Sequence, residues 1–187
     1  MVNRVLVLGS PGSGKSTLAR PLARQLYVPY VSMDDHYWGR NWQRPDGSEW
    51  ESWLSRKARL PKWLIDGNHA RTLSLRAEHA EIALIVEAHP VLCAWRIIWR
   101  SVQIRRGRYE FAPALVAEGL RAREHNSSSR ELRSLVRLAL SFRRQTLPHV
   151  LETLEAYGVP ILVVRNWESE DTIIARIEDL LKEAKRP

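Results

Sequence analysis

The sequence predicts an α/β fold in which helices cover both faces of a parallel β-sheet. Three observations predict it: short apolar runs alternate with helical stretches, several of these runs are apolar almost throughout, and a glycine-rich turn follows the first of them. A strand that is buried on both faces has no need of alternating polar positions, so such runs indicate a sheet between two helical layers. With 187 residues, 44% of them hydrophobic, the chain is expected to form one domain spanning residues 1–187.

Five apolar runs are the expected strands, and they comprise residues 4–8, 28–33, 63–65, 81–87 and 161–164. Helical spacing follows the first strand over residues 15–26, where leucines recur every four positions. Pro21 lies inside this helix and predicts a kink or a local irregularity. The longest helix is expected at residues 129–157 and the last at 171–185, and residues 39–47 and 107–113 are expected to be loops.

The turn after the first strand contains a complete phosphate-binding motif, G-x-x-x-x-G-K-[ST]. Its residues are Gly9, Ser10, Pro11, Gly12, Ser13, Gly14, Lys15, Ser16 and Thr17. Glycines allow the backbone to curl so that successive N–H groups point into one anion-sized hollow, and the following helix adds the partial positive charge of its N-terminus. We therefore expect this motif to bind ATP, with Lys15 at the β- and γ-phosphates and the Ser16 hydroxyl as a ligand of Mg²⁺.

Acidic residues follow the second and third strands. In a parallel sheet the carboxyl ends of the strands share one edge with the glycine-rich turn, so these acids are expected near the phosphates. Asp66, which ends the third strand, is the expected metal residue together with Ser16. Asp34 is the expected catalytic base that orients or deprotonates an acceptor hydroxyl, with Asp35 as the alternative. Another interpretation is that this Asp pair only caps the following segment.

The positive charge of the chain is concentrated in one segment. Between Trp95 and Thr146 there are twelve arginines, no lysines and four glutamates, an excess that equals the formal net charge of +8. Arginine favours planar, bidentate contacts with phosphate, so this 95–146 block predicts an anionic partner, either a nucleotide or a nucleic acid. Arg96 and Arg100 lie one helical turn apart, so both guanidinium groups can face one ligand.

These motifs resemble those of the adenylate-kinase-like small P-loop kinases. The resemblance rests on the phosphate-binding motif, the Asp pair, and the stretch Asp66-Gly67-Asn68 followed by Arg71-Thr72-Leu73 and Arg76. Within that group the sequence resembles bacterial proteins known as DNA topology modulation proteins, or as AAA-family or P-loop ATPases. The resemblance implies a three-layer P-loop NTPase fold with a five-stranded sheet of order 2-3-1-4-5, an acceptor-side helical segment at 34–60, and a mobile, Arg-rich helical lid at about 100–130.

The resemblance also implies roles for individual residues. The residues expected to bind the acceptor are Asp35, Asn68, Arg71 and Arg76. Nucleoside monophosphate kinases have the arginine that grips the acceptor phosphate one position earlier than Arg71, which argues against a standard monophosphate acceptor. Arg96 and Arg100 match the arginine pair that opens the lid in those kinases, so we expect them to be catalytic, against the adenine and the transferring phosphate.

Most of the tryptophans are assigned to packing. Trp50 and Trp53, three positions apart, are expected to pack a helix on the sheet, and Trp95 and Trp99 are expected in the core. The two tryptophans left open between packing and a stacking surface for an acceptor ring are Trp38 and Trp42.

The leading hypothesis is an ATP- and Mg²⁺-dependent phosphotransferase, a kinase of an unidentified small acceptor. The alternatives are a nucleic-acid-associated ATPase that uses the 95–146 block and a nucleotide-binding regulator without catalysis. No apolar run approaches the roughly 20 residues needed to cross a bilayer, and the N-terminus lacks the pattern of a signal peptide, so we expect a cytoplasmic protein with no membrane partner. The single cysteine, Cys93, excludes an internal disulfide and is expected to be buried.

Overall fold

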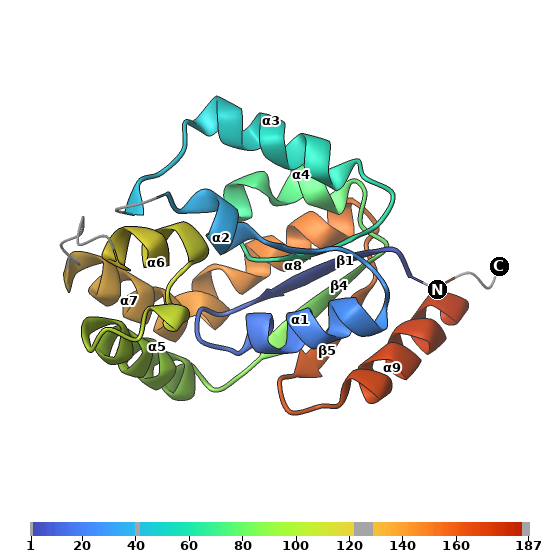
Figure 1. Cartoon of the computed structure of the whole chain (residues 1–187). Helices are drawn as coiled ribbons and strands as arrows, with labels where there is room; N and C mark the ends of the chain where they lie inside the picture. The colour runs from blue at the N-terminus through green and yellow to red at the C-terminus, as the bar shows by residue number, and fades with distance from the viewer. Residues whose placement is uncertain (1, 40–41, 122–128, 185–187) are drawn as a thin grey trace.

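A computed structural model describes residues 2–39, 42–121 and 129–184 (Figure 1). Its strands form one parallel sheet of order β2-β3-β1-β4-β5, which confirms the predicted order. The strands are β1 (Arg4–Gly9), β2 (Tyr30–Ser32), β3 (Trp63–Asp66), β4 (Ile82–Glu87) and β5 (Ile161–Arg165). The register pairs both Val7 of β1 and Ser32 of β2 with Asp66, so the carboxyl ends of these three strands meet at one edge.

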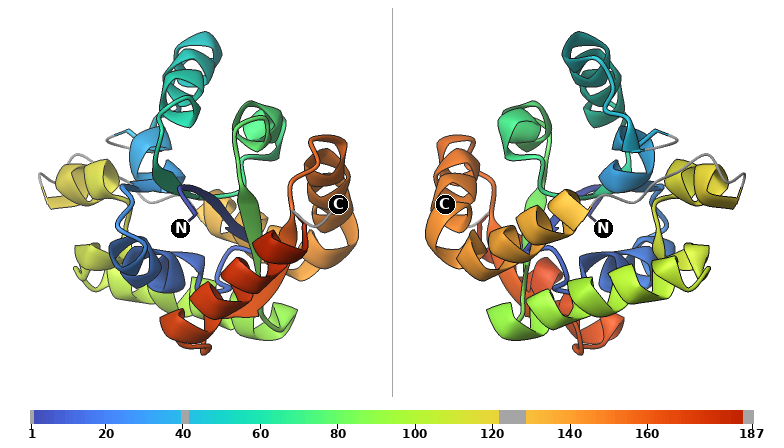
Figure 2. Two further views of the ribbon diagram at one scale, coloured as in Figure 1. Left: turned by 90° about the vertical axis from the view of Figure 1, so that its right-hand side faces the viewer. Right: turned by 90° about the vertical axis from the view of Figure 1, so that its left-hand side faces the viewer.

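Helices cover both faces of the sheet, as predicted (Figure 2). Helices α1 (Lys15–Gln25) and α9 (Glu170–Glu183) pack on one face, and α3 (Gly47–Ala58), α4 (Leu73–Ala77) and α8 (Leu147–Ala156) pack on the other. Successive residues of β1 point to opposite faces: Val5 and Val7 belong to the first core, and Leu6 and Leu8 belong to the second. Because both faces are covered, all four side chains are fully buried, and this is why the strand is apolar throughout.

The remaining helices gather beyond the carboxyl ends of the strands, at the left of Figure 1. They are α2 (Met33–Tyr37), the 3₁₀ helix η2 (Ala70–Thr72), α5 (Pro90–Arg105), the 3₁₀ helix η3 (Tyr109–Phe111), α6 (Ala114–Arg121) and α7 (Ser129–Gln145). Helices α5 and α7 share a small apolar core that includes the buried Cys93. The predicted lid therefore corresponds to the end of α5, η3 and α6, while residues 122–128 of it lie outside the described part of the chain.

The structure corrects several predictions of local structure. The long helix expected at 129–157 is two helices, α7 and α8, that meet at Thr146, because Pro148 has no N–H to continue the helical ladder. The second strand is shorter than expected, since Met33 begins α2. Helix α1 continues through Pro21. Within the described residues, no helix is both long enough and apolar enough to cross a membrane.

The tryptophans divide between core and surface differently from the prediction. Trp50 is buried and Trp53 packs against the same core, as expected, with their rings stacked at 5.1 Å. Trp95 and Trp99 are not in the core, because 58% and 40% of their surfaces are exposed on α5. The face of α5 that packs on α7 holds smaller residues, Cys93 and Ile97, which leaves the larger rings outside.

Candidate active site

The glycine-rich turn adopts a backbone that only glycine tolerates at its critical positions. Gly12 and Gly14 have φ angles of 79° and 94°, in the left-handed region. A Cβ on Gly12 would lie 2.4 Å from the carbonyl oxygen of Cys93 in α5, and one on Gly14 would lie 2.7 Å from the side chain of Asn166. The phosphate-binding turn is therefore enclosed by α5 on one side and by the β5–α9 connection on the other.

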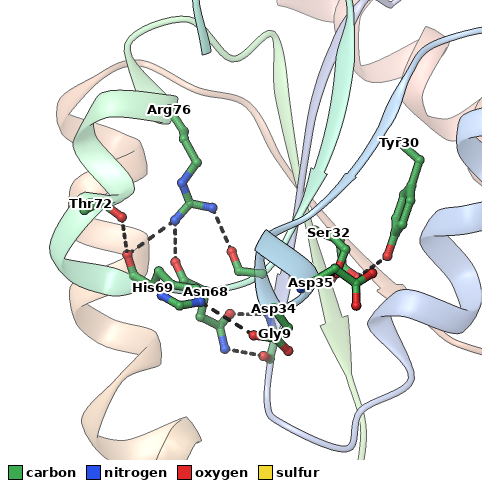
Figure 3. Close-up of polar contacts among 11 residues, drawn as sticks. Gly9, Tyr30, Ser32, Asp34, Asp35, Asn68, His69, Thr72 and Arg76 are labelled. Atoms are coloured by element: carbon green, nitrogen blue, oxygen red, sulfur yellow. Dashed lines mark hydrogen bonds and ion pairs between the residues drawn. The ribbon is translucent and has the colours of Figure 1, made fainter. Parts of the chain in front are cut away.

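Asn68 connects this turn to the end of β3. Its side-chain oxygen accepts a hydrogen bond from the N–H of Gly9 at 2.9 Å, and its amide nitrogen donates to the carbonyl of Gly9 at 2.6 Å (Figure 3). Both ends of the amide are occupied by backbone groups. In this structure Asn68 therefore fixes the first residue of the motif beside Asp66, and its predicted contact with an acceptor stays a prediction.

Arg76 is buried beside the 67–69 segment. Its guanidinium donates to the carbonyl oxygens of Gly67, at 2.7 Å, and of Asn68 (Figure 3). Burial lowers the pKa of Arg76 to about 9, which leaves it charged at neutral pH. Through these contacts Arg76 shapes the segment that carries His69, and its predicted contact with an acceptor stays a prediction.

Lys15 lies at the centre of the charged groups. Its ammonium group donates to the carbonyl of Ser10 at 2.9 Å, within the phosphate-binding turn. Burial lowers the pKa of Lys15, and the negative charges of Asp66 and Asp34 raise it in part. A desolvated ammonium group beside two carboxylates is suited to receive the negative charge of a phosphate.

Asp66 is buried at the end of β3, with 3% of its surface exposed. One carboxylate oxygen accepts a hydrogen bond from the hydroxyl of Tyr30 at 2.9 Å, and Oδ1 has no hydrogen-bond partner in the described part of the chain. Burial raises the pKa of Asp66, while Lys15 and the hydroxyls of Ser16 and Tyr30 lower it in part. An unpartnered carboxylate oxygen beside the Ser16 hydroxyl supplies the hard oxygen ligands that Mg²⁺ prefers, directly or through water.

Asp34 lies in the first turn of α2, and its carboxylate is 63% exposed. The ring Nε2 of His69 lies 3.5 Å from Asp34 Oδ1. Enclosure by the surrounding atoms raises the pKa of Asp34, but the hydrogen bond from His69 and the positive charges of Lys15 and Arg100 outweigh that effect and leave the pKa below its usual range. Asp34 is therefore an ionised and accessible carboxylate beside the phosphate-binding lysine.

The second acid of the pair, Asp35, faces the lid. Its Oδ1 accepts a hydrogen bond from the backbone N–H of Ala114 at 3.0 Å, at the start of α6. Its other oxygen lies 3.4 Å from the guanidinium of Arg20. In this conformation Asp35 connects α2 to α6, and its predicted contact with an acceptor stays a prediction.

The predicted catalytic arginines both project toward the site from α5. Arg96 donates to the carbonyls of Gly12 and Ser13, both at 3.3 Å, so it contacts the phosphate-binding turn directly. The positive charge of Arg100 lowers the pKa of both Lys15 and Asp34. Arg71, the remaining predicted acceptor residue, is exposed on η2.

Aromatic side chains form a wall behind Asp34. The ring of His69 lies 4.4 Å from that of Tyr37 and 5.5 Å from that of Trp50, measured between centroids. A cavity of about 670 Å³ lies against α2 and α3, with Trp50 and Trp53 in its lining. The lining also includes the charged side chains of Glu49 and Arg56, so this hollow beside α2 combines aromatic and charged groups.

Three residues that contribute to this site were not among the predicted site residues: Tyr30, His69 and Asn166. Tyr30 begins a strand and Asn166 lies in a turn, so their sequence context indicates only secondary structure. His69 follows a motif residue, but its distance to Asp34 depends on how α2 and the 67–69 segment pack. None of these contacts has a local sequence signal.

Comparisons with known proteins identify solved structures that have a similar fold. No family model and no curated protein matches the sequence. The structure is similar to a shikimate kinase from Acinetobacter baumannii in complex with shikimate, with a TM-score of 0.60 and 13% sequence identity over 100% of this chain and 97% of the other. A gluconokinase from Sinorhizobium meliloti 1021 is similar over 97% of this chain and 93% of the other, with a TM-score of 0.50 and 15% identity.

A shikimate kinase from Bacteroides thetaiotaomicron is also similar over the full length of both chains, with a TM-score of 0.54 and 16% identity. Identities this low show the fold alone, and that fold is the one of the small P-loop kinases. The comparisons do not support the resemblance to DNA topology modulation proteins.

Proposed function

We propose that this protein is an ATP-dependent phosphotransferase that acts on a hydroxyl group of a small molecule. The observation that carries the proposal is the pairing of Lys15 with two carboxylates whose pKa values are shifted in opposite directions. Environments that separate two carboxylates in this way give them different chemical roles. Asp66 is buried beside Ser16, as a metal-binding acid would be, and Asp34 is ionised and accessible, as an acceptor-orienting acid would be.

On the nucleotide side, the backbone N–H groups of the turn and Lys15 hold the phosphates of ATP. Ser16 and Asp66 hold Mg²⁺, which when bound neutralises charge on the phosphates of the nucleotide. Asn68 keeps the turn in register with Asp66 through its two hydrogen bonds to Gly9. Tyr30 orients Asp66 by occupying one of its carboxylate oxygens.

On the acceptor side, Asp34 accepts a hydrogen bond from the acceptor hydroxyl and directs its oxygen at the γ-phosphorus. A carboxylate with a lowered pKa is a weak base, so it orients the hydroxyl early and takes its proton late, when the new P–O bond has made that proton acidic. A loose transition state for phosphoryl transfer makes positioning more important than proton removal.

Arg100 and Arg96 complete the charge balance. Arg100, whose charge acts on both Lys15 and Asp34, stabilises the negative charge on the phosphoryl group in transit. Arg96 fixes the turn through the carbonyls of Gly12 and Ser13. The lid, which includes α6, excludes water, which would otherwise accept the phosphoryl group.

The identity of the acceptor is tested by release of ADP from Mg·ATP in the presence of nucleosides, sugars, hydroxy acids, other hydroxylated metabolites and duplex DNA. The similar solved structures include a kinase bound to shikimate, so small hydroxylated acids belong in this panel. We expect one class of small molecule to stimulate ADP release, and Lys15→Ala to abolish the stimulation. Stimulation by DNA alone, with no small molecule active, would contradict the proposal.

A further inference from the structure

His69 has a backbone conformation that a residue with a side chain rarely adopts. Its φ of 34° lies in the left-handed region, where only glycine is free of steric cost. A strained position of this kind persists only where the surrounding structure holds it, and such positions concentrate at functional sites. Contacts of both the backbone and the ring hold His69 in this position.

The backbone of His69 is held by hydrogen bonds to its carbonyl oxygen. Its carbonyl oxygen accepts hydrogen bonds from the N–H and the hydroxyl of Thr72, at 3.0 and 3.1 Å, and from the guanidinium of Arg76 at 3.4 Å (Figure 3). Arg76 also binds the two preceding carbonyls, those of Gly67 and Asn68. A fully buried arginine thus fixes three consecutive carbonyls and with them the direction in which the side chain of His69 leaves the backbone.

The ring of His69 is held from the sides. The rings of Tyr37 and Trp50 lie against it, and 20% of its side chain is exposed. The ring therefore has little freedom to turn, and Nε2 faces Oδ1 of Asp34 at 3.5 Å. A proton on Nε2 makes this an attractive polar contact with the carboxylate.

Asp34 has other charged neighbours that compete for its carboxylate. Lys15 and Arg100 are both positive and both act on its carboxylate, which is 63% exposed and so has room to move. An ion pair between Asp34 and Lys15 would neutralise the ammonium group that the phosphates need. Among the described residues, His69 is the side chain with which Asp34 makes a direct polar contact.

We propose that His69 is a positioning residue that holds the carboxylate of Asp34 away from Lys15 and toward the acceptor hydroxyl, and that Arg76 is the buried support of this arrangement. The inference rests on the proposed function, since it assigns His69 a task only if Asp34 orients an acceptor. It extends the site from the two carboxylates to a connected series: Arg76, the 67–69 backbone, His69 and Asp34.

The test compares His69→Gln with His69→Phe. Glutamine places an amide N–H close to the position of Nε2, whereas phenylalanine fills the aromatic pocket without a donor. We expect the pKa of Asp34, followed by carbon-13 NMR of the carboxyl group, to rise in both variants, because both lose the positive charge of the ring. The rise should be larger in His69→Phe, which also lacks a donor for the carboxylate.

The second readout is hydrolysis of Mg·ATP with water as the acceptor, a reaction that needs no identified substrate. We expect kcat to fall about 10- to 100-fold in His69→Phe, as for a misplaced catalytic group, with the affinity for Mg·ATP unchanged. His69→Gln should stay within about threefold of wild type, since the amide donor replaces that of the ring. Matched melting temperatures of the two variants exclude a difference in folding.

Three outcomes separate the inference from the function on which it rests. An Asp34 pKa that is the same in His69→Phe as in the wild type would overturn the inference, as would equal losses of kcat in both variants. A raised Asp34 pKa in His69→Phe without any change in turnover would support the His69–Asp34 contact and instead contradict the role of Asp34 in the proposed function.

Discussion

At the scale of single residues, Asp34 and Asp66 show how position changes the chemistry of one residue type. Asp66 ends a central strand, so it is buried and its pKa is raised, while Asp34 lies in the first turn of the short helix α2 and its pKa is lowered. Lys15 feels both. Their different environments follow from the lengths of β2 and β3, because β2 ends at Ser32 and the chain turns into α2 before Asp34.

The raised pKa of Asp66 predicts a pH dependence of metal binding. Mg²⁺ binds the ionised carboxylate, so affinity is full above the pKa of Asp66 and is lost as the pH falls through it. Because this pKa is raised, the loss should begin at a higher pH than for an ordinary aspartate. Tyr30→Phe removes a hydrogen bond that favours the ionised form and should move the loss to still higher pH.

The measurement for this prediction is Mg²⁺ affinity in the presence of ADP, by calorimetry from acid to neutral pH. Tyr27→Phe is the matched control, since the side chain of Tyr27 is 82% exposed. An identical pH profile in Tyr30→Phe and Tyr27→Phe would contradict the assignment of Asp66 to the metal.

The buried polar groups also explain why some residue roles were not predicted. The resemblance implied acceptor binding for Asn68 and Arg76. In the structure their side chains bind backbone groups of Gly9, Gly67 and Asn68 that need hydrogen-bond partners. This need arises from the tertiary path of the backbone and has no sequence pattern.

At the scale of helices and strands, the contact between α2 and α6 connects the acceptor side to the lid. The carboxylate of Asp35 accepts a hydrogen bond from the N–H of Ala114, at the N-terminal end of α6. Asp35→Ala should remove this contact and speed exchange of the Ala114 amide hydrogen about five- to tenfold, the equivalent of one ordinary hydrogen bond. Amide hydrogen exchange followed by NMR measures this rate.

Arg20→Ala provides the control for the α2–α6 contact. It removes the other partner of Asp35, an ion pair whose arginine side chain is 58% exposed, and such pairs contribute little. Exchange of the Ala114 amide should therefore change little in Arg20→Ala. The hydrogen bond from Ala114 to Asp35 would not hold α6 if Asp35→Ala and Arg20→Ala both altered exchange of the Ala114 amide. The same conclusion would follow if neither substitution altered it.

The contact between the phosphate-binding turn and α5 makes a second prediction at this scale. Gly12→Ala adds a Cβ that would lie 2.4 Å from the carbonyl of Cys93, at a φ of 79°. We expect a loss of at least about 2 kcal/mol in the free energy of unfolding, since both strain and backbone displacement contribute, together with loss of Mg·ATP binding.

Gly158→Ala is the matched substitution for Gly12→Ala. Gly158 has a φ of 63° but no atom within 4 Å of its added Cβ, so it carries only the conformational cost, about 1–2 kcal/mol. Thermal unfolding and calorimetry compare the two variants. Equal destabilisation of both, or full nucleotide binding by Gly12→Ala, would show that α5 does not constrain the turn.

At the scale of the whole molecule, the fold could be predicted because buried parallel strands and a complete motif leave few alternatives. The sheet order and the two helical layers agree with the prediction. The division of the 129–157 helix at Thr146 was missed because one proline competes with a long helical pattern. The exposure of Trp95 and Trp99 was missed because spacing alone does not say which face of α5 packs on α7.

The 95–146 block divides into two groups in the structure. Arg96 and Arg100 belong to the candidate site, whereas Arg133 and Arg137 are exposed on α7 beside an apolar groove that includes Ile98. If the protein is a small-molecule kinase, replacing Arg133 and Arg137 together by alanine should leave Mg·ATP turnover within about twofold, because solvent-exposed charges outside a site contribute little.

The same double variant tests the nucleic-acid alternative. Binding of duplex DNA should be weak in the wild type and should vanish at moderate salt, as for non-specific attraction to a basic surface. If the wild type bound DNA tightly and the double variant lost both DNA binding and ATP turnover, Arg133 and Arg137 would have a role in the function.

The most direct test of the account is to follow the destination of the γ-phosphoryl group by phosphorus-31 NMR. Mg·ATP and the acceptor that most stimulates ADP release are incubated with the wild type and with Asp34→Asn. The account predicts ADP and one phosphorylated small molecule from the wild type, and from Asp34→Asn a rate at least about 100-fold lower with unchanged affinity for Mg·ATP. Inorganic phosphate as the sole product with every acceptor, or full transfer activity in Asp34→Asn, would contradict it.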